Sequence, residues 1–441
     1  MGSDLCAKKV ECRFDLRFVL EQTLKNNKTI KAAEKDVSSS LIGIDVQKSA
    51  FRPSIRIGVD HTLAENKHWS IDSSEKNRRQ EEPENFRRDH DTKGHFIVSH
   101  NLFRGGADKA AVKEAESIAK AKKSEFESIK QNVLCESAFI FLDVIAKKKE
   151  MLHLESLLKA RKSSLEVATE MYNTGVEKYV AVMQARAACA ETESHLAKTE
   201  AEYKTLCAKF QETTGVEIQD NMVIPTNLFD DRMKRIQVQD IALRHNPKII
   251  ASFDRLNAAK DSVKKPNQGI YPSLDVFYRF DRSFDLGTIT PTTTTNAKNH
   301  SVGVSFTIPI YDGGKGAAGK RQIIEQAAKT AIEHDKTIDE TKSEIIRILA
   351  AIKAFKESTD DAEVAVEMRR LVLHDTEEEY KAGVKIMNDV LEAQQKLFEA
   401  QTIEVQTQNN YLKNQCNALA LLGEMTIEHI QKRKFYHRRE K

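Results

Sequence analysis

The stretch Leu102-Phe103-Arg104-Gly105-Gly106 recurs as Ile310-Tyr311-Asp312-Gly313-Gly314, and it fixes how the rest of the chain is interpreted. A second phrase, Tyr172-Asn173-Thr174-Gly175-Val176, recurs as Tyr380-Lys381-Ala382-Gly383-Val384. Gly105 and Gly313 are 208 positions apart, and so are Gly175 and Gly383. Because two separate phrases share one spacing, the sequence predicts an internal duplication.

Upstream residues extend this match at a spacing of 219 positions. The first-half residues are Leu24, Asn27, Ile30, Ala32, Pro53 and Ser54, and their counterparts are Leu243, Asn246, Ile249, Ala251, Pro272 and Ser273. The 11-residue difference between the two spacings predicts an insertion between Ser54 and Leu102. A polar loop is the natural place for it, because loops tolerate insertions.

Composition excludes several classes of protein. The 441 residues include only 8 Pro and 17 Gly, which predicts long uninterrupted elements. Although 31% of the residues are charged, the net charge is only +3, so we expect no nucleic-acid partner. No apolar run is long enough for a spanning helix. That leaves membrane strands possible, since their signal per strand is weaker.

The first half reads as helix, strand, polar loop, strand and two long helices. Apolar spacing predicts a helix over 15–48, and alternation predicts strands at about 53–64 and 95–103. Between them, 65–94 is dense in charged residues, so we expect a solvated loop. Residues 107–174 and 176–214 contain neither Gly nor Pro and are rich in helix formers. A straight helix of the first length would span roughly 100 Å.

The second half repeats this order. We expect a helix broken at Asn246-Pro247, then further strands and helices whose ranges are about 272–281, 301–310, 315–382 and 384–422. The chain then divides into an N-terminal extension, a first repeat, a linker, a second repeat and a basic C-terminal tail, with ranges 1–14, 15–215, 216–236, 237–423 and 424–441.

Four strands with one apolar face barely make a stable sheet, and their edges need partners. Copies of the same chain would supply them, since a cyclic oligomer closes each piece into one barrel. Three copies would give about 12 strands, an even number within the range of outer-membrane barrels.

With these features in place, the chain resembles the TolC family of outer-membrane efflux and export proteins. The matching phrases are Asn246-Pro247, Tyr271-Pro272-Ser273-Leu274, Pro309 to Gly314, Tyr380 to Gly383, and Asp389-Val390-Leu391. Their order and duplication cover residues from about 14 to 425. The resemblance implies a mainly α fold in which a trimeric 12-stranded transmembrane β-barrel continues into a long periplasmic α-helical barrel. It also implies partners: a periplasmic adaptor (membrane fusion protein), an inner-membrane pump of the RND, ABC or MFS type, and outer-membrane lipid.

The resemblance also assigns a pore gate to Asp389 and Glu392, whose i, i+3 spacing places them on one helix face. Threefold symmetry would then give a ring of carboxylates that favours cations. In the first half the corresponding aspartate position is Ala181, preceded by Val180, so a closing link through that aspartate is in doubt. The plain alternative is that Asp389 and Glu392 belong to a solvated helix face.

The resemblance places helix-tip closure and adaptor docking at the two reversals, on Tyr172, Gly175, Val176, Tyr380, Gly383, Val384 and Lys385. Tyr380 and Lys385 match a tyrosine and a basic residue that tie closed tips together in the family. Alternatively, Tyr172 and Tyr380 are simply core aromatics. Gly105, Gly106, Gly313 and Gly314 mark the junctions between strand and helix.

Other candidate sites are weak. Gly314 to Lys320 satisfies G-x-x-x-x-G-K, but Arg321 replaces the Ser or Thr that a phosphate loop places next. The histidines lack ligand spacing, and no catalytic triad or carboxylate pair stands out, so we predict no enzyme activity, cofactor or metal site. The six cysteines, Cys6, Cys12, Cys135, Cys189, Cys207 and Cys416, lack C-x-x-C spacing, which supports neither zinc nor a redox pair. For Cys6 and Cys12, a disulfide or lipid modification is the alternative to free thiols.

The sequence therefore predicts a passive outer-membrane exit duct of a Gram-negative bacterium, serving drug efflux or type I secretion and gated at its periplasmic helix tips. The rival is a soluble coiled-coil scaffold, since long Ala-, Leu-, Glu- and Lys-rich helices are common there. Alternating strands placed equally in both repeats argue against that rival.

Overall fold

The computed structural model describes most of the chain, in two compact units. The described residues are 14–68, 85–218, 222, 223, 225, 228, 229, 235–265, 271–284 and 297–428. Unit 1 comprises Met1–Ser38, Lys120–Asp254 and Ala331–Lys441, and unit 2 comprises Ser39–Ala119 and Arg255–Thr330. Most of the expected terminal segments, most of the linker and the tips of both polar loops lie outside the described residues.

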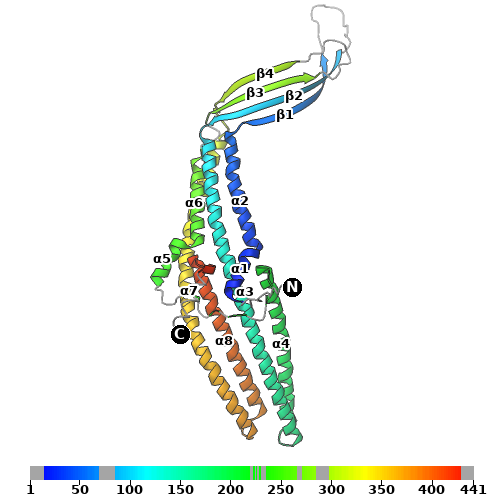
Figure 1. Cartoon of the computed structure of the whole chain (residues 1–441), viewed down its shortest axis with the longest axis vertical. Coiled ribbons are helices and arrows are strands. Elements are labelled where there is room, and N and C mark those ends of the chain that lie inside the picture. Colours follow the sequence, from blue (N-terminus) through cyan, green and yellow to red (C-terminus); the bar gives the residue numbers. More distant parts are fainter. Residues whose placement is uncertain are drawn as a thin grey trace, which may run out of the picture. The chain divides into compact units, whose positions relative to one another are not determined.

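One order of elements occurs twice along the chain (Figure 1). The first half contains α1 (Leu16–Asn26), α2 (Lys28–Lys48), the 3-10 turn η1 (Ser49–Phe51), β1 (Ser54–His68), β2 (Asn85–Arg104), α3 (Ala107–Asn173) and α4 (Tyr179–Thr214). The second half contains α5 (Arg235–His245), α6 (Pro247–Lys264), β3 (Ser273–Phe284), β4 (Lys298–Thr307), α7 (Lys315–Lys381) and α8 (Met387–Leu422). Helices α3 and α7 each have 67 residues, and α4 and α8 each have 36.

A buried asparagine breaks each opening helix at the same point. The Asn246 side chain accepts from the backbone N–H groups of Lys248 and Ile249 at 2.8 and 3.3 Å, which caps α6. Its Nδ2 donates to the carbonyl of Leu421, near the end of α8, at 2.9 Å. Each asparagine therefore caps one helix and holds the end of another.

Asn27 repeats this arrangement at the start of α2, where it accepts from Thr29 and Ile30 and donates to Thr213 near the end of α4 at 3.0 Å. The single helix expected over 15–48 was therefore wrong, because this joint interrupts it. The sequence pattern missed the break because Asn27, unlike Asn246, has no proline after it.

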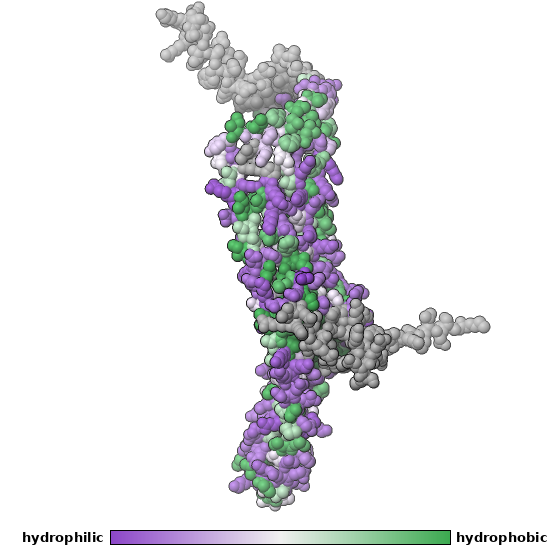
Figure 2. All heavy atoms as spheres, turned by 90° about the vertical axis from the view of Figure 1, so that its left-hand side faces the viewer, coloured by the Kyte–Doolittle hydropathy of each residue, from purple (hydrophilic) through white to green (hydrophobic). Residues whose placement is uncertain are grey.

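The four strands of unit 2 form one antiparallel sheet in the order β1-β2-β3-β4 (Figure 1). The register aligns apolar residues across all four strands on one face, because paired residues point to the same side. These residues are Ile55, Ile57, Val59, Phe96, Val98, Leu274, Val276, Tyr278, Phe280, Val302, Val304 and Phe306. Ile57 and Val302 are each 79% exposed, so no described residue covers this part of the face. Figure 2 shows green hydrophobic residues gathered in the part of unit 2 that holds the strands.

The opposite face of the sheet is mostly polar, with Ile97 and Phe277 as apolar members. His95 lies 3.2 Å from the Asp60 carboxylate, the Ser54 and Ser99 hydroxyls are 2.7 Å apart, and Arg279 donates to Asp281 at 2.8 Å. The sequence alternation thus predicted the two faces of the sheet correctly.

The ends of the strands differ from the expected ones. β1 and β2 pair as far as His68 with Asn85, so 65–68 and 85–94 are strand rather than loop. Ladder hydrogen bonds come from backbone groups, which a charged sequence supplies as well as an apolar one. β4 ends at Thr307, earlier than expected, and α4 and α8 begin three residues later than expected. None of the described helices is long and apolar enough to span a bilayer.

The largest core lies in unit 1 and joins α1, α3, α4, α5, α7 and α8. Its fully buried side chains include Phe14, Leu20, Phe141, Phe210 and Leu419. A second cluster lies at the reversals, and a small one contains Leu154, Leu157 and Phe398. The two long hairpins are thus joined most extensively at the main core.

Candidate functional site

The two helix reversals of unit 1 use the same backbone solution. Gly175 and Gly383 both have a φ of 78°, and both donate to the carbonyl of the tyrosine three residues earlier, at 3.0 and 2.9 Å. The backbone N–H groups of Val176 and Val384 donate to the carbonyls five residues earlier, those of Met171 and Glu379, each at 2.9 Å. Glycine fits here because side-chain-bearing residues rarely adopt positive φ.

Residues of both reversals meet in one cluster. It contains Ala168, Ala181, Ala185, Ala188, Tyr380, Met387, Val390 and Leu391. Beyond it, Val176 and Val384 are 74% and 72% exposed, and Lys385 is exposed as well. The tips therefore present apolar side chains that no described residue covers.

The two tyrosines differ although their local sequences match. Tyr172 is 43% exposed, and its ring centroid lies 5.3 Å from that of Tyr179. Tyr380 is only 5% exposed, and its hydroxyl has no hydrogen-bond partner among the described residues. Burial, together with the negative charge of Glu177 on the first reversal, raises the pKa of Tyr380 to about 12. Tyr380 therefore stays neutral at physiological pH.

Glu177 is an acidic residue of the first reversal that comparing the two repeats does not point to. The position corresponding to Asp389 holds Ala181, which is buried at 7% exposure and packs in the shared cluster. Glu177 lies four residues earlier and belongs to the turn itself, so no motif match points to it. Only the folded arrangement brings its charge to Tyr380.

The two proposed gate residues have local partners within the chain. The Asp389 carboxylate accepts from the Ile386 backbone N–H at 3.2 Å, in the first turn of α8, where a negative charge also favours the helix dipole. Glu392 forms an ion pair with Lys396 and its side chain is 55% exposed. Both carboxylates thus remain available to solvent on α8, with Asp389 half-buried.

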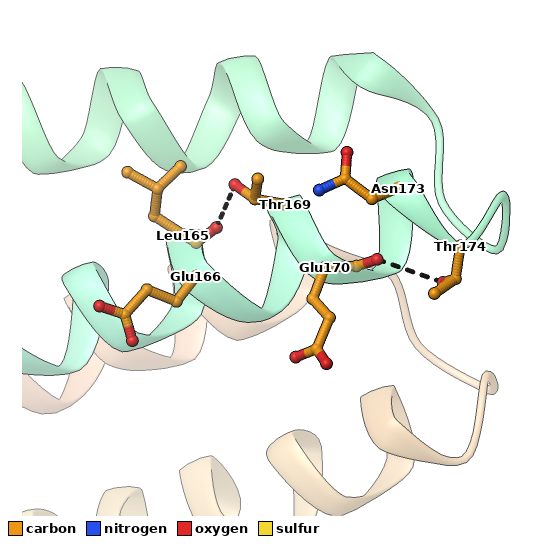
Figure 3. A pocket seen from close by; sticks show the side chains of 6 residues that line it. All are labelled: Leu165, Glu166, Thr169, Glu170, Asn173 and Thr174. Carbon is orange, nitrogen blue, oxygen red and sulfur yellow. Dashed lines mark hydrogen bonds between the residues drawn. The ribbon is translucent and has the colours of Figure 1, made fainter.

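A shallow pocket of about 440 Å³ lies along the last turns of α3, next to the first reversal. Its lining residues are Leu165, Glu166, Thr169, Glu170, Asn173 and Thr174 (Figure 3). Figure 3 shows the Glu166 and Glu170 side chains extending from the same side of α3. The Thr169 and Thr174 hydroxyls donate to the backbone carbonyls of Leu165 and Glu170, so the two carboxylates and the Asn173 amide are the polar groups that face solvent here.

A buried arginine ties three helices together between the reversals and the main core. Arg161 of α3 is 6% exposed and donates to the Ala188 carbonyl of α4 at 2.9 Å and to Gln395 of α8 at 2.8 Å. One turn further along α3, the Ser164 hydroxyl accepts a hydrogen bond from Nε2 of Gln394 at 2.9 Å. Burial lowers the pKa of Arg161 from its ordinary value. Sequence reasoning missed this link because its partners lie far away in the chain.

The junctions between strands and helices use positive-φ glycines. Gly105 has a φ of 60°, and a Cβ there would lie 2.3 Å from the Tyr271 side chain. Gly106, Gly313 and Gly314 have φ values of 80°, 72° and 82°.

The residues of the G-x-x-x-x-G-K pattern, Gly314 to Lys320, form the turn at the second junction and the start of α7. The Asp312 carboxylate accepts from the N–H groups of Gly314 and Gly316 at 3.0 and 2.7 Å. Lys320 donates to the carbonyls of Val263 and Lys265 at the end of α6. Because these donors already have partners, the pattern belongs to the strand-to-helix connection.

Among the described residues, one serine and one histidine come together in the manner of a catalytic pair. The Ser252 hydroxyl lies 2.8 Å from Nδ1 of His334, but it also lies 2.8 Å from the Ile249 carbonyl, and no described carboxylate bonds to the histidine ring. Within the residues that the structure describes, no group of three or more His, Cys, Asp or Glu is arranged to hold a metal ion.

A sheet with one exposed apolar face, joined to two long helical hairpins, defines an outer-membrane channel protein. The chain belongs to the family described as outer membrane efflux protein, whose model matches residues 19–216 and 238–424. The expected family resemblance is thereby confirmed. The protein is an efflux or secretion channel of the outer membrane of a Gram-negative bacterium.

Known relatives agree with this assignment. The chain is 25% identical to the outer membrane efflux protein BepC of Brucella suis, over 93% of this chain and 86% of BepC. It is 20% identical to the outer membrane protein TolC of Escherichia coli, over 94% of this chain and 83% of TolC. The solved structure of the Campylobacter jejuni CmeC outer membrane channel superposes with a TM-score of 0.76 at 17% identity, covering 93% of this chain and 85% of CmeC.

Proposed function

We propose that the chain forms a homotrimer that closes three four-stranded sheets into one barrel and three pairs of hairpins into a periplasmic helical tube. The observation that carries this proposal is the apolar face that runs in register across all four strands. An uncovered apolar face favours lipid, and the unpaired edges of β1 and β4 in the single chain call for neighbouring copies. The equal lengths of corresponding helices support an origin by duplication, with repeats at 15–215 and 237–423.

In this proposal the trimer is a passive exit duct, without cofactor or catalysis. A periplasmic adaptor docks on the exposed tips around Tyr172, Val176, Val384 and Lys385, and an inner-membrane pump of the RND, ABC or MFS type supplies the energy. Relatives support either cargo: BepC is an efflux protein, and AprF of Pseudomonas aeruginosa is an alkaline protease secretion protein. AprF is 22% identical over 40% of this chain and 36% of its own length. The comparisons lend no support to a soluble scaffold.

The gate of the duct lies at Asp389 and Glu392 in this proposal. Both lie in the first two turns of α8, close to the helix tip, and threefold symmetry would bring six carboxylates into one aqueous ring. Such a ring attracts multivalent cations and lets them block the current. Asp389 also caps α8, so its charge and its hydrogen bond must be separated in a test.

The test is block by trivalent cations in planar-bilayer recordings of single trimers. Asp389→Asn with Glu392→Gln keeps an acceptor oxygen for the cap and removes the charge, so we expect block to weaken by tenfold or more, about 1.4 kcal/mol. The matched control is Glu191→Gln with Glu212→Gln, two exposed acids on α4, which should leave block unchanged. Equal block in both double variants would show that the gate lies elsewhere.

A further inference from the structure

On the polar face of the sheet, one ring in each half of the chain lies over a glycine of the neighbouring strand. His95 of β2 pairs directly with Gly58 of β1. Phe277 of β3 pairs in the same way with Gly303 of β4. A Cβ added to Gly58 would overlap Nε2 and Cε1 of the His95 ring, and one added to Gly303 would lie 2.5 Å from Cζ of Phe277. Because non-bonded carbon atoms pack at about 3.5–4.0 Å, each ring occupies the space that a side chain on the facing glycine would need.

The two halves carry the same pair with the ring and the glycine exchanged. Gly58 and Phe277 are equivalent at the spacing of 219 positions, and His95 and Gly303 are equivalent at the spacing of 208. The first half therefore has its ring on its second strand, and the second half has its ring on its first strand. Each pair of strands thus has one ring and one glycine at this place, which indicates room for only one ring per pair.

Both rings lie along the sheet. Neighbouring strands are about 4.8 Å apart, so a ring that lies flat reaches the backbone of the next strand. Nδ1 of His95 lies 3.2 Å from the carboxylate of Asp60, which is two residues along β1 from Gly58 and therefore on the same face. The His95 side chain is only 23% exposed, and Phe277 is half-buried as well. The rings therefore cover strand backbone instead of extending away from the sheet.

We propose that Gly58 and Gly303 keep the bore of the channel wide by letting these rings lie against its wall. This inference rests on the proposed trimer, in which the apolar face of the sheet meets lipid and the polar face lines the lumen. A side chain at either glycine would push the facing ring off the wall and into the lumen of every copy. Two residues without side chains therefore help to set the largest solute that can pass.

Exclusion of neutral polymers from single trimers in a planar bilayer tests this proposal. Polyethylene glycols of graded size are added to the outer side alone, and the smallest size that leaves the current unchanged marks the limit of entry. Gly58→Phe brings a second ring against His95, so we expect the limit to fall by at least one step of the polymer series. Gly58→Phe with His95→Gly places the only ring on β1, as in the second half, and should restore the wild-type limit.

Controls separate the width of the lumen from a general effect on the sheet. Ile57→Phe adds the same ring to the next residue of β1, on the opposite face, where Ile57 is 79% exposed, and should leave the limit unchanged. Gly58→Ala, whose methyl group already overlaps the His95 ring, gives the same comparison if the larger variant does not assemble.

Three results would overturn the proposal: an unchanged limit in the Gly58 variants, an equal fall in Ile57→Phe, or a double variant that stays narrow. Each of them leaves the proposed channel intact, because the wild type still conducts. A wild-type protein that conducts no current would instead refute the proposed channel, and this inference with it.

Discussion

Replacing Asn246 by alanine should loosen the joint between α5, α6 and α8. The side chain is 2% exposed and makes three hydrogen bonds, two to the first turn of α6 and one to Leu421 of α8. Loss of a helix cap costs about 1 kcal/mol. The carbonyl of half-buried Leu421, left without its donor, costs about 1–3 kcal/mol more. The local opening free energy should therefore fall by about 2–4 kcal/mol.

Hydrogen exchange measured by mass spectrometry resolves this effect by segment. A loss of 2–4 kcal/mol corresponds to exchange that is roughly 30-fold to 900-fold faster. We expect it in peptides that contain Lys248 and Ile249 and in those at the end of α8. Peptides near Gly175, in the first reversal, should keep their wild-type rates.

Asn246→Asp separates the two contributions. Aspartate keeps the oxygen that caps α6 and removes the donor to Leu421, so the first turn of α6 should stay protected while the end of α8 opens. Asn27→Ala, the equivalent change in the first half, should loosen the end of α4 instead, where Asn27 holds Thr213. If Asn246→Ala speeds exchange at α6 by less than about threefold, the joint does not depend on this side chain.

Three further predictions concern melting and titration of the detergent-solubilised protein. Gly383→Ala, at a φ of 78°, should lower stability by about 1–2 kcal/mol. Gly319→Ala, inside α7 with open space around it, should raise stability by about 0.5–1 kcal/mol. Equal melting temperatures of the two variants would contradict this. Tyr380→Phe removes a buried hydroxyl without a hydrogen-bond partner among the described residues, so stability should stay the same or rise. In a pH titration, the phenolate absorbance of Tyr380, which the variant lacks, should appear only near pH 12. A clear loss of stability would favour a closing contact instead. Hydrogen bonds from Ser117 and Lys264 lower the pKa of Asp261. The stability that Asp261 contributes is therefore full above the ordinary carboxyl pKa and is lost as the pH falls through the lowered pKa. Asp261→Asn should melt at a lower temperature than wild type at neutral pH and at the same temperature in strong acid.

Local sequence determined the elements of this protein and their order. Long stretches without Gly or Pro gave helices over nearly the expected ranges, because helix formation depends on residues a few positions apart. Strict alternation gave the apolar face of the sheet, because side chains in a strand alternate between faces. The equal spacing of Gly105 with Gly313 and of Gly175 with Gly383 revealed the duplication, and all four glycines have positive φ.

Tertiary structure decided which side chains meet. Tyr172 and Tyr380 begin the same phrase, yet one is exposed and the other buried, because their surroundings come from other helices. The hydrogen bonds from Arg161 to Gln395 and from Cys135 to Asn417 join residues more than two hundred positions apart. Such contacts depend on the register in which α3 packs against α8, and the repeating pattern of a long helix fits several registers almost equally. Only the packed core selects one of them, so the folded chain alone shows where these side chains meet.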